Sequence, residues 1–444
     1  MKSFNSKYDC IVDSIDCHEN ILMHGPGGTG KSYTIGRLVR QFAVSRSIAC
    51  TGMTGVAAAN LREELQNTTG TNVLVDVRTL HSWAGIGNGN GTPDEVLQRT
   101  KRNAGARRRW NTVDLLFIDE VSMLGANLLE MLDYIARNVR RTFSKPFGGL
   151  QVVFSGDFLQ IPPVHDDWCF SSACWETLEI MPYIFETGYR FDDPRYFELL
   201  LRARQGCLNS DDEDLLRGRV TSFEALDLSD RDAIIPSVLS AHNSTTEAYN
   251  ERALRLLNSP VRTFTATDER HGKTAKALDH VIPRRIDLAV GAQVLLKANL
   301  NINLGLVNGA RGIVTSVAPV LEVKFRNGVN QIITPHTWRI NENLKDLAKD
   351  DHRPRVSFSR TQIPLILAWA ITIHRAQSST LECAVIDLGD SIFTCGQAYV
   401  ALSRVKTLNG LFLKAFSPRS VFADATVLNF DQQLKQRDAV EYIE

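Results

Sequence analysis

The stretch NILMHGPGGTGKS, residues 20–32, decides the fold of this chain. An apolar run ends at His24, four glycines and a Lys-Ser pair follow, and apolar residues at helical spacing begin at Ile35. This order predicts a strand, a phosphate loop and a helix, because glycines free backbone N–H groups and a helix N-terminus attracts anions. A turn that only reverses the chain needs one or two glycines and no placed Lys-Ser pair. The chain is therefore expected to bind a nucleoside triphosphate.

The expected roles within this loop follow from phosphate chemistry. Lys31 reaches the β- and γ-phosphates, the Ser32 hydroxyl holds Mg²⁺, and backbone N–H groups cradle the phosphates. The predicted nucleotide-binding residues of the loop are Gly25, Gly27, Gly28, Thr29, Gly30, Lys31 and Ser32.

Two further predicted strands end in polar residues suited to phosphoryl transfer. Asp119 and Glu120 follow the apolar run LLFI at residues 115–118, and Gln160 lies in VVFSGDFLQIPP at residues 152–163. Asp119 is expected to hold Mg²⁺ and Glu120 to activate the attacking water, because the reaction needs neutralised charge and an oriented nucleophile. Gln160 is expected to sense the γ-phosphate by hydrogen bonding. Without the phosphate loop, these acids would read as surface or capping groups, and the Gln160 run as a turn ended by prolines.

Length and composition set the class of protein. At 444 residues the chain is expected to form two large domains, and no apolar run approaches 18 residues. The first residues lack the pattern of a secretory or mitochondrial signal, so we expect an intracellular soluble protein, in the nucleus if eukaryotic or else encoded by a virus. Eight cysteines contain no C-x-x-C pair, which favours reduced, mostly buried thiols over a zinc site or a disulfide framework.

Charge gives no global attraction to nucleic acid, because 50 basic residues balance 50 acidic ones. Binding to nucleic acid would have to use local patches, such as the basic clusters at residues 99–109 and 137–145. Such runs are usually solvated faces, and that interpretation stays open for both clusters.

Strands and helices alternate through the first half, which favours a parallel sheet with helices on both faces and ligands at the carboxyl ends of the strands. A second α/β series begins after about residue 186. Between residues 286 and 362 the pattern changes to short strands punctuated by Gly and Asn, including Asn327-Gly328, which predicts an inserted β-barrel. Residues 85–111 have few apolar anchors and are expected to form a small, partly mobile excursion from the first domain.

Three residues have both a functional and a bland interpretation. Arg190 and Arg404 could act as arginine fingers if the second domain faces the phosphate loop, although an arbitrary arginine is more often a surface ion pair. Trp83 could stack on a base or belong to the core.

The ordered motifs resemble superfamily 1 helicases of the PIF (petite integration frequency) type, within superfamily 1B. The resemblance spans about residues 20–415, and KPFGGLQ at 145–151 is similar to a signature of that type alone. The other matching motifs are GPGGTGKS (25–32), TGVAA (54–58), TLHSWAGIG (79–87), IDEVSML (118–124), GDFLQIPPV (156–164), LVNGARG (306–312), ITIHRAQ (371–377) and ALSR (401–404).

The resemblance implies two RecA-like P-loop NTPase domains of α/β class: residues 1–185 as domain 1A, and residues 186–285 with 363–444 as domain 2A. The small excursion at about 85–111 would be domain 1B and residues 286–362 an inserted SH3-like barrel, domain 2B. The implied activity is ATP-dependent, 5′-to-3′ DNA unwinding, with Mg²⁺ and ATP as cofactors, single-stranded and forked duplex DNA as partners, no membrane, and a monomer in isolation. The implied ATP-site residues are Lys31, Ser32, Asp119, Glu120, Gln160, Arg190, Gln377 and Arg404, and the DNA-contacting residues are Thr54, His81 and His374, joined by Trp83 as a stacking candidate.

Two other functions remain open from the residues. One is an ATP-gated single-stranded nucleic-acid binding protein without productive unwinding. It is favoured by Ser378, where relatives commonly have Gly, and by the lack of an adenine-reading Gln near Tyr8. The other is a small-molecule phosphotransferase, which the second α/β series with its own arginine motifs disfavours.

Overall fold

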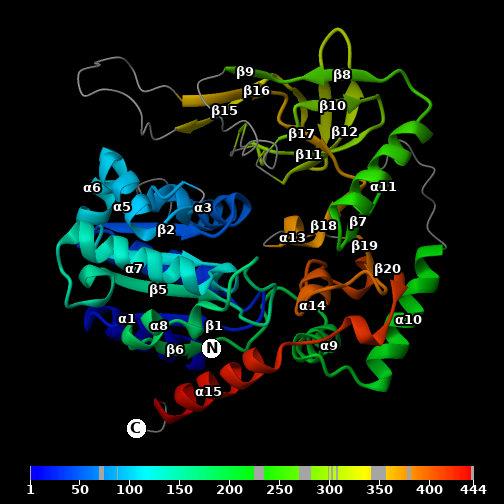
Figure 1. Ribbon diagram of the computed structural model, residues 1–444. Helices are drawn as coiled ribbons and strands as arrows, with labels where there is room; N and C mark the ends of the chain where they lie inside the picture. Colours follow the sequence, from blue (N-terminus) through cyan, green and yellow to red (C-terminus); the bar gives the residue numbers. More distant parts are fainter. Residues whose placement is uncertain are drawn as a thin grey trace. The chain divides into compact units, whose positions relative to one another are not determined.

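The computed structural model describes residues 2–69, 75–87, 89–224, 235–269, 282–298, 300–301, 304–306, 309–341, 357–377, 381 and 383–441 (Figure 1). The chain divides into two compact units. Unit 1 comprises Met1–Val220, Ala376–Cys383 and Leu388–Glu444, and unit 2 comprises Thr221–Arg375 and Ala384–Asp387. Helices α10 (Ser210–Glu224) and α13 (Ile373–Ala376) contain two of the boundaries between these units. Ser378, Val307 and Asn308, which belong to sequence motifs, lie outside the described residues.

Unit 1 is built on a six-stranded parallel sheet with strand order β3-β2-β4-β5-β1-β6 (Figure 1). Strand β1 is central because it pairs with both β5 and β6, so the phosphate loop emerges from inside the sheet. The predicted α/β class with a parallel sheet is confirmed. The strands are β1 (Ile21–His24), β2 (Ile48–Gly52), β3 (Asp76–Thr79), β4 (Leu115–Asp119), β5 (Gln151–Gly156) and β6 (Met181–Ile184).

Successive side chains of each strand point to opposite faces of the sheet, and helices cover both faces, so both faces are buried. In β1, Ile21 and Met23 pack with helices α1 (Lys2–Asp16), α2 (Lys31–Phe42) and α3 (Gly55–Thr69). Leu22 faces the other way, toward α7 (Ala126–Arg140), α8 (Ala173–Thr177) and α15 (Ala425–Glu441). The sheet is therefore a rigid middle layer that fixes the positions of its strand ends.

The described part of residues 80–112 contains three helices: α4 (Leu80–Ala84), α5 (Pro93–Arg102) and α6 (Ala104–Thr112). Helix α5 begins with a capping box, in which Thr92 accepts from the Glu95 N–H and Glu95 accepts from the Thr92 N–H. Few apolar residues suffice here because Val96, Leu97 and Trp110 are buried in the core on this face of the sheet.

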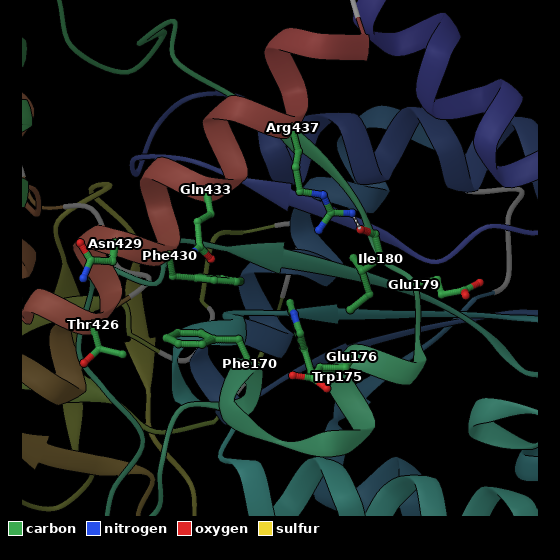
Figure 2. A pocket seen from close by; sticks show the side chains of 10 residues that line it. All are labelled: Phe170, Trp175, Glu176, Glu179, Ile180, Thr426, Asn429, Phe430, Gln433 and Arg437. Atoms are coloured by element: carbon green, nitrogen blue, oxygen red, sulfur yellow. Dashed lines mark hydrogen bonds between the residues drawn. The ribbon is translucent and has the colours of Figure 1, made fainter.

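Helix α15 packs on unit 1 through aromatic and polar contacts. The Phe430 ring stacks on Phe170 with centroids 4.0 Å apart, and Arg437 donates to the Ile180 carbonyl at 2.7 Å. These residues line a pocket of about 530 Å³, and none of the predicted site residues lines it. Figure 2 shows the side chains around this pocket. Unit 1 also contains α9 (Pro194–Gln205), α14 (Gln397–Leu402) and β20 (Leu411–Phe416).

Unit 2 contains part of the second predicted α/β series, and residues 186–220 and 388–444 of that series belong to unit 1. Strands β18 (Ala370–Thr372), β7 (Ser237–Ser240) and β19 (Ala384–Leu388) pair in parallel, and α11 (Asn243–Leu256) is tied to β18 by two hydrogen bonds between Asn250 and Ala370.

Three antiparallel sheets complete unit 2. A five-stranded sheet has the order β14-β13-β12-β11-β17, and the others are β15-β16-β9 and β10-β8. The hairpin predicted at Asn327-Gly328 is confirmed, since the Phe325 N–H donates to the Val329 carbonyl at 2.8 Å and Gly328 has a φ of 84°. The strands are β8 (Arg262–Thr265), β9 (Thr267–Glu269), β10 (Arg285–Leu288), β11 (Gln293–Leu296), β12 (Arg311–Ser316), β13 (Glu322–Phe325), β14 (Asn330–Ile332), β15 (His336–Asn341), β16 (Ser357–Gln362) and β17 (Leu365–Leu367).

Two composition-based expectations can be compared with the structure. All eight cysteines are free, but only Cys50, Cys169 and Cys174 are buried, so the expectation that most would be buried is wrong. No helix in the described part of the chain is both long and apolar enough to span a bilayer.

Candidate nucleotide-binding site

The phosphate loop joins β1 to α2 and uses glycine where other residues would be strained. Gly28 and Gly30 have φ values of 82° and 88°, in the left-handed region that favours glycine. The Lys31 ammonium donates to the carbonyl oxygens of Gly25 and Pro26, both at 2.7 Å, and the Thr29 hydroxyl donates to Pro26 at 2.8 Å. Burial lowers the pKa of Lys31 to about 8, although nearby carboxylates oppose the shift. The lysine therefore lies inside the loop, largely as a cation at neutral pH.

The two predicted acids lie at the carboxyl end of β4, directly beside the phosphate loop's lysine. Asp119 is the last residue of the strand, and Glu120 has φ 60° and ψ 48°, a left-handed conformation that is uncommon outside glycine. A Cβ on Gly156, at the end of β5, would lie 2.8 Å from the Val121 nitrogen, so glycine is needed for this close approach. Burial, with the neighbouring Glu120 charge, raises the pKa of Asp119 to about 6.

Two buried glutamines lie near the catalytic-base candidate, and one of them, Gln377, contacts it. Gln377 donates from Nε2 to Glu120 Oε2 and to Gln160 Oε1, both at 3.4 Å, and the two glutamines are 2% and 5% exposed. Among the described residues, Gln377 Oε1 has no hydrogen-bond partner. The structure thus brings together three side chains that the sequence placed in separate motifs.

Both predicted arginine fingers lie against the phosphate loop. A Cβ on Gly27 would lie 3.7 Å from an Arg404 Nη2, and a Cβ on Gly28 would lie 2.6 Å from the Arg190 Cβ. Arg404 is 2% exposed and donates to the Val400 carbonyl at 2.8 Å and the Ser403 hydroxyl at 2.7 Å. Burial, with the Arg190 charge, lowers the pKa of Arg404 to about 10, so the guanidinium stays charged at neutral pH.

These residues fit a magnesium–nucleotide. Lys31, Arg190 and Arg404 surround a glycine loop with positive charge, which suits phosphate oxygens. In the described residues, no group of three or more His, Cys, Asp or Glu side chains could hold a metal ion on its own. Mg²⁺ binds through one or two protein oxygens together with substrate phosphates, and the Ser32 hydroxyl and the Asp119 carboxylate are such oxygens.

The predicted DNA-contacting residues Thr54 and His81 follow the ends of neighbouring strands. Thr54 comes after β2 and His81 after β3, and both are partly exposed at the same edge of the sheet as Asp119. The Thr54 hydroxyl also accepts from the Ala57 N–H at 3.1 Å, which caps α3. His374 lies in unit 2, on α13 directly after β18. Burial lowers the pKa of both histidines, so each is neutral at physiological pH.

The stacking role predicted for Trp83 is wrong for this structure. The indole is completely buried and its ring meets that of Trp110 edge-on, with centroids 4.6 Å apart. No face of the ring is left for a base to stack on. The neighbouring Arg109 is similarly committed, because its guanidinium donates to the Ser82 and Trp83 carbonyl oxygens at 2.9 and 2.8 Å.

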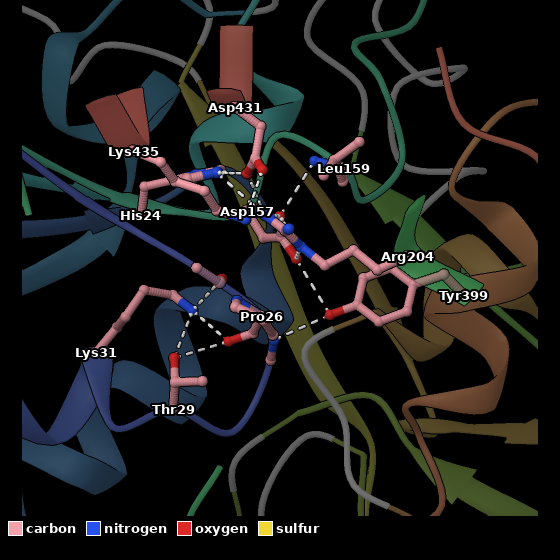
Figure 3. Close-up of polar contacts among 12 residues, drawn as sticks. His24, Pro26, Thr29, Lys31, Asp157, Leu159, Arg204, Tyr399, Asp431 and Lys435 are labelled. Carbon is pink, nitrogen blue, oxygen red and sulfur yellow. Dashed lines mark hydrogen bonds and ion pairs between the residues drawn. The ribbon is translucent and has the colours of Figure 1, made fainter. Parts of the chain in front are cut away.

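Sequence reasoning missed a buried polar network that adjoins the phosphate loop (Figure 3). We call it the relay, and it consists of Tyr399, Asp157, Arg204, Asp431 and His24, all of them buried. Its links join residues as far as 407 positions apart, so no local spacing could have revealed them. The available signal was the presence of charged residues, Arg204 and Asp431, within the segments that form helices α9 and α15.

Comparison with known proteins shows which family the chain resembles. A model of the PIF1-like helicase matches residues 2–181, and a model of the DNA helicase Pif1 2B domain matches residues 278–317. The chain is similar to PIF1-like helicases, through the family model at residues 2–181 and through relatives that match almost all of this chain. The ATP-dependent DNA helicase PIF1 of Danio rerio is 34% identical over 447 residues, covering 98% of this chain and 64% of that protein. The chain thus spans just under two thirds of the length of this relative.

Solved structures of PIF1-type helicases share the fold. The Pif1 helicase from Candida albicans matches with a TM-score of 0.80 and 28% identity, covering 96% of this chain and 98% of that one. The Pif1 helicase from Bacteroides, in complex with ADP-AlF3 and single-stranded DNA, matches with a TM-score of 0.74 and 26% identity, covering 97% of both chains. These likenesses cover almost the whole chain, so they include residues of both units.

Proposed function

We propose that this chain is an ATP-dependent DNA helicase that moves 5′ to 3′ on single-stranded DNA and unwinds duplexes. The observation that carries the proposal is the approach of Arg404 and Arg190 to the phosphate loop, beside the Glu120–Gln377–Gln160 cluster. A simple nucleotide-binding domain needs only the loop and the acid pair. The added arginines and glutamines supply the parts that a phosphoryl-transfer motor requires.

Each side chain has a task in the proposed hydrolysis. Lys31 and the loop N–H groups bind the phosphates, while Ser32 and Asp119 hold Mg²⁺. The metal ion, when bound, neutralises the charge that develops on the phosphate oxygens. Glu120 orients the attacking water and accepts its proton. Gln377 positions the Glu120 carboxylate by a hydrogen bond, and Gln160 contacts Gln377. Arg190 and Arg404 stabilise the transition-state charge, a role worth about 10³ to 10⁵ in rate in other NTPases.

The chain would move along DNA if nucleotide binding and hydrolysis change its contacts with the DNA strand. We propose residues 1–185 as motor domain 1A with the 85–111 excursion as 1B, residues 186–285 and 363–444 as domain 2A, and residues 286–362 as an SH3-like barrel. Thr54, His81 and His374 are the proposed DNA contacts, since all three follow strand ends and are partly exposed. Each base-pair step opened costs about 1.4 kcal/mol, which one ATP can supply. The proposed substrate is forked duplex DNA. We also propose that the chain is a monomer in isolation, and light scattering would measure its molar mass in solution.

The test compares ATP turnover with and without single-stranded DNA, and strand displacement on duplexes with 5′ or 3′ tails. We expect strong stimulation by DNA and displacement from the 5′-tailed duplex only. Lys31→Ala is the control, because it removes a phosphate contact and should abolish turnover while the circular dichroism spectrum stays unchanged.

Other outcomes separate the alternatives. Slow turnover with tight DNA binding and no displacement would indicate an ATP-gated binding protein. Turnover indifferent to DNA, with transfer to a small acceptor, would indicate a phosphotransferase. Displacement from 3′ tails would contradict the proposed polarity, and retained turnover in Lys31→Ala would contradict the site.

A further inference from the structure

The Tyr399 hydroxyl connects the phosphate loop to an acidic side chain. It lies 3.1 Å from the Gly27 nitrogen and 3.1 Å from Asp157 Oδ2 (Figure 3). An amide can only donate and a carboxylate can only accept, so the phenol must accept from Gly27 and donate to Asp157. Burial raises the pKa of Tyr399, which keeps the phenol neutral and able to fill both roles. The Gly27 N–H, at the point where Arg404 meets the loop, is therefore held by a side chain from α14.

Asp157 in turn shapes the loop that carries Gln160. Its Oδ1 accepts from the Leu159 N–H at 3.1 Å, and its carbonyl accepts from the Gln160 N–H at 3.0 Å. Arg204, from α9, donates from Nε and Nη2 to the Asp157 carboxylate at 2.9 to 3.1 Å. One carboxylate thus fixes Gly27 through Tyr399 and Gln160 through its own loop. Any shift of Arg204 would therefore change the positions of both Gly27 and Gln160.

The relay ends on helix α15. The same Arg204 Nη2 donates to Asp431 Oδ1 at 2.8 Å, and the His24 ring lies 2.7 Å from that oxygen through Nε2. Burial lowers the pKa of His24, so the ring is neutral and its Nε2–H donates to Asp431. Lys435, one turn further along α15, lies 3.1 Å from Asp431 Oδ2. Arg204 therefore forms ion pairs with both Asp157, beside the phosphate loop, and Asp431 on α15, and its side chain is 3% exposed.

We propose that α15 is a positioning element for ATP hydrolysis, acting on the phosphate loop through Asp431, Arg204, Asp157 and Tyr399. None of these side chains needs to touch the nucleotide. Their effect is to set the Gly27 backbone relative to Arg404, and Gln160 relative to Gln377. The inference rests on the proposed ATPase function. It adds that the last described helix of the chain, which contains no sequence motif, controls the rate at that site.

The test uses three substitutions that each change few atoms. Tyr399→Phe removes one hydroxyl, and Asp431→Asn replaces one oxygen and removes its charge. The matched control is Asp438→Asn, also a carboxylate of α15, which contacts Lys7 and the Ile184 N–H but no residue of the relay. We expect Tyr399→Phe and Asp431→Asn each to lower kcat for ATP about fivefold, the size of one lost net hydrogen bond, with KM changed less than about twofold. Asp438→Asn should leave kcat unchanged.

The kcat of the double variant, Tyr399→Phe with Asp431→Asn, shows whether the two residues act through one relay or independently. Tyr399 and Asp431 make no direct contact with each other in the relay, so independent effects would multiply to about 25-fold. A relay in series predicts about fivefold for the double variant as well. A multiplied loss, or an unchanged kcat in Tyr399→Phe, would overturn the proposal.

Hydrogen exchange of the amides at residues 27–30 gives a readout that needs no turnover. Both variants should speed this exchange and the control should not, whereas unchanged exchange in both would contradict the relay. If the unmodified chain failed to hydrolyse ATP, the proposed function would fall while the exchange result still judged the relay.

Discussion

Glu120 combines a strained backbone with the side chain proposed to activate the attacking water. Its left-handed conformation costs of the order of 1 to 3 kcal/mol in a residue other than glycine, and such strain is tolerated where surrounding structure imposes it. Here the close approach of Gly156 to Val121 and the Gln377 hydrogen bond impose it. The Glu120 carboxylate is thus held by a hydrogen bond from Gln377.

Glu120→Gln should bind nucleotide normally but turn it over 10² to 10⁴ times more slowly, because the amide keeps the shape and loses the proton acceptor. Fluorescent-nucleotide titration and a phosphate-release assay would measure the two quantities. Loss of nucleotide binding would instead mean that Glu120 has a structural role.

Asp119 should show a conflict between stability and activity. Its pKa rises from 3.8 to about 6, so between these values the folded chain keeps a proton that the unfolded chain has lost. The ionised carboxylate therefore destabilises the fold, by an amount absent below about pH 4 and complete above about pH 6. Asp119→Asn is expected to raise the free energy of unfolding by about 2 kcal/mol at pH 7.5 and by less at pH 5, while Mg²⁺-dependent turnover is lost. Urea denaturation at the two pH values would measure the gain, and a loss of stability at pH 7.5 would contradict it.

At the scale of elements, helices α4 and α6 are joined by the Trp83–Trp110 pair. Trp83→Phe removes one ring of a buried indole and is expected to cost about 1 to 3 kcal/mol of unfolding free energy. Affinity for single-stranded DNA, measured by anisotropy at fixed salt, should not change, whereas a lost base stack would cost about 1 to 3 kcal/mol of binding. Trp110→Phe, on the other side of the same contact, is the control and should behave alike. A weaker affinity in Trp83→Phe alone would restore the stacking role.

Elements defined by local pattern were predictable from the sequence. The strand, loop and helix around Lys31 and the acids after β4 needed only neighbouring residues, and the chemistry of the loop indicated its ligand. Helices α5 and α6 were missed because their apolar residues are sparse, although the Thr92 to Glu95 capping box was a readable signal. The Tyr399 link to Gly27 joins residues 372 positions apart, so it depends on tertiary packing that no spacing encodes.

At the scale of the whole molecule, the predicted nucleotide-binding residues all belong to unit 1. They include Gln377, because the chain re-enters unit 1 at Ala376. Nucleotide binding should therefore stabilise the two units unequally. A non-hydrolysable ATP analogue with Mg²⁺, at 100 times its Kd, is expected to add about 2.7 kcal/mol to the unit that binds it. Hydrogen exchange should slow in β1, α2 and α14, and much less in β11 to β13. Equal protection of both units would contradict this division.

The central place of β1 has a consequence for synthesis on the ribosome. The strand that carries the phosphate loop pairs with β5 and β6, which follow it by about 130 and 160 residues, and His24 meets Asp431 only 407 residues later. At roughly 5 to 20 residues per second, the relay can close no sooner than about 20 to 80 seconds after His24 has been added. A nascent chain would thus hold an incomplete relay, and a phosphate loop without its Tyr399 contact, for most of its translation.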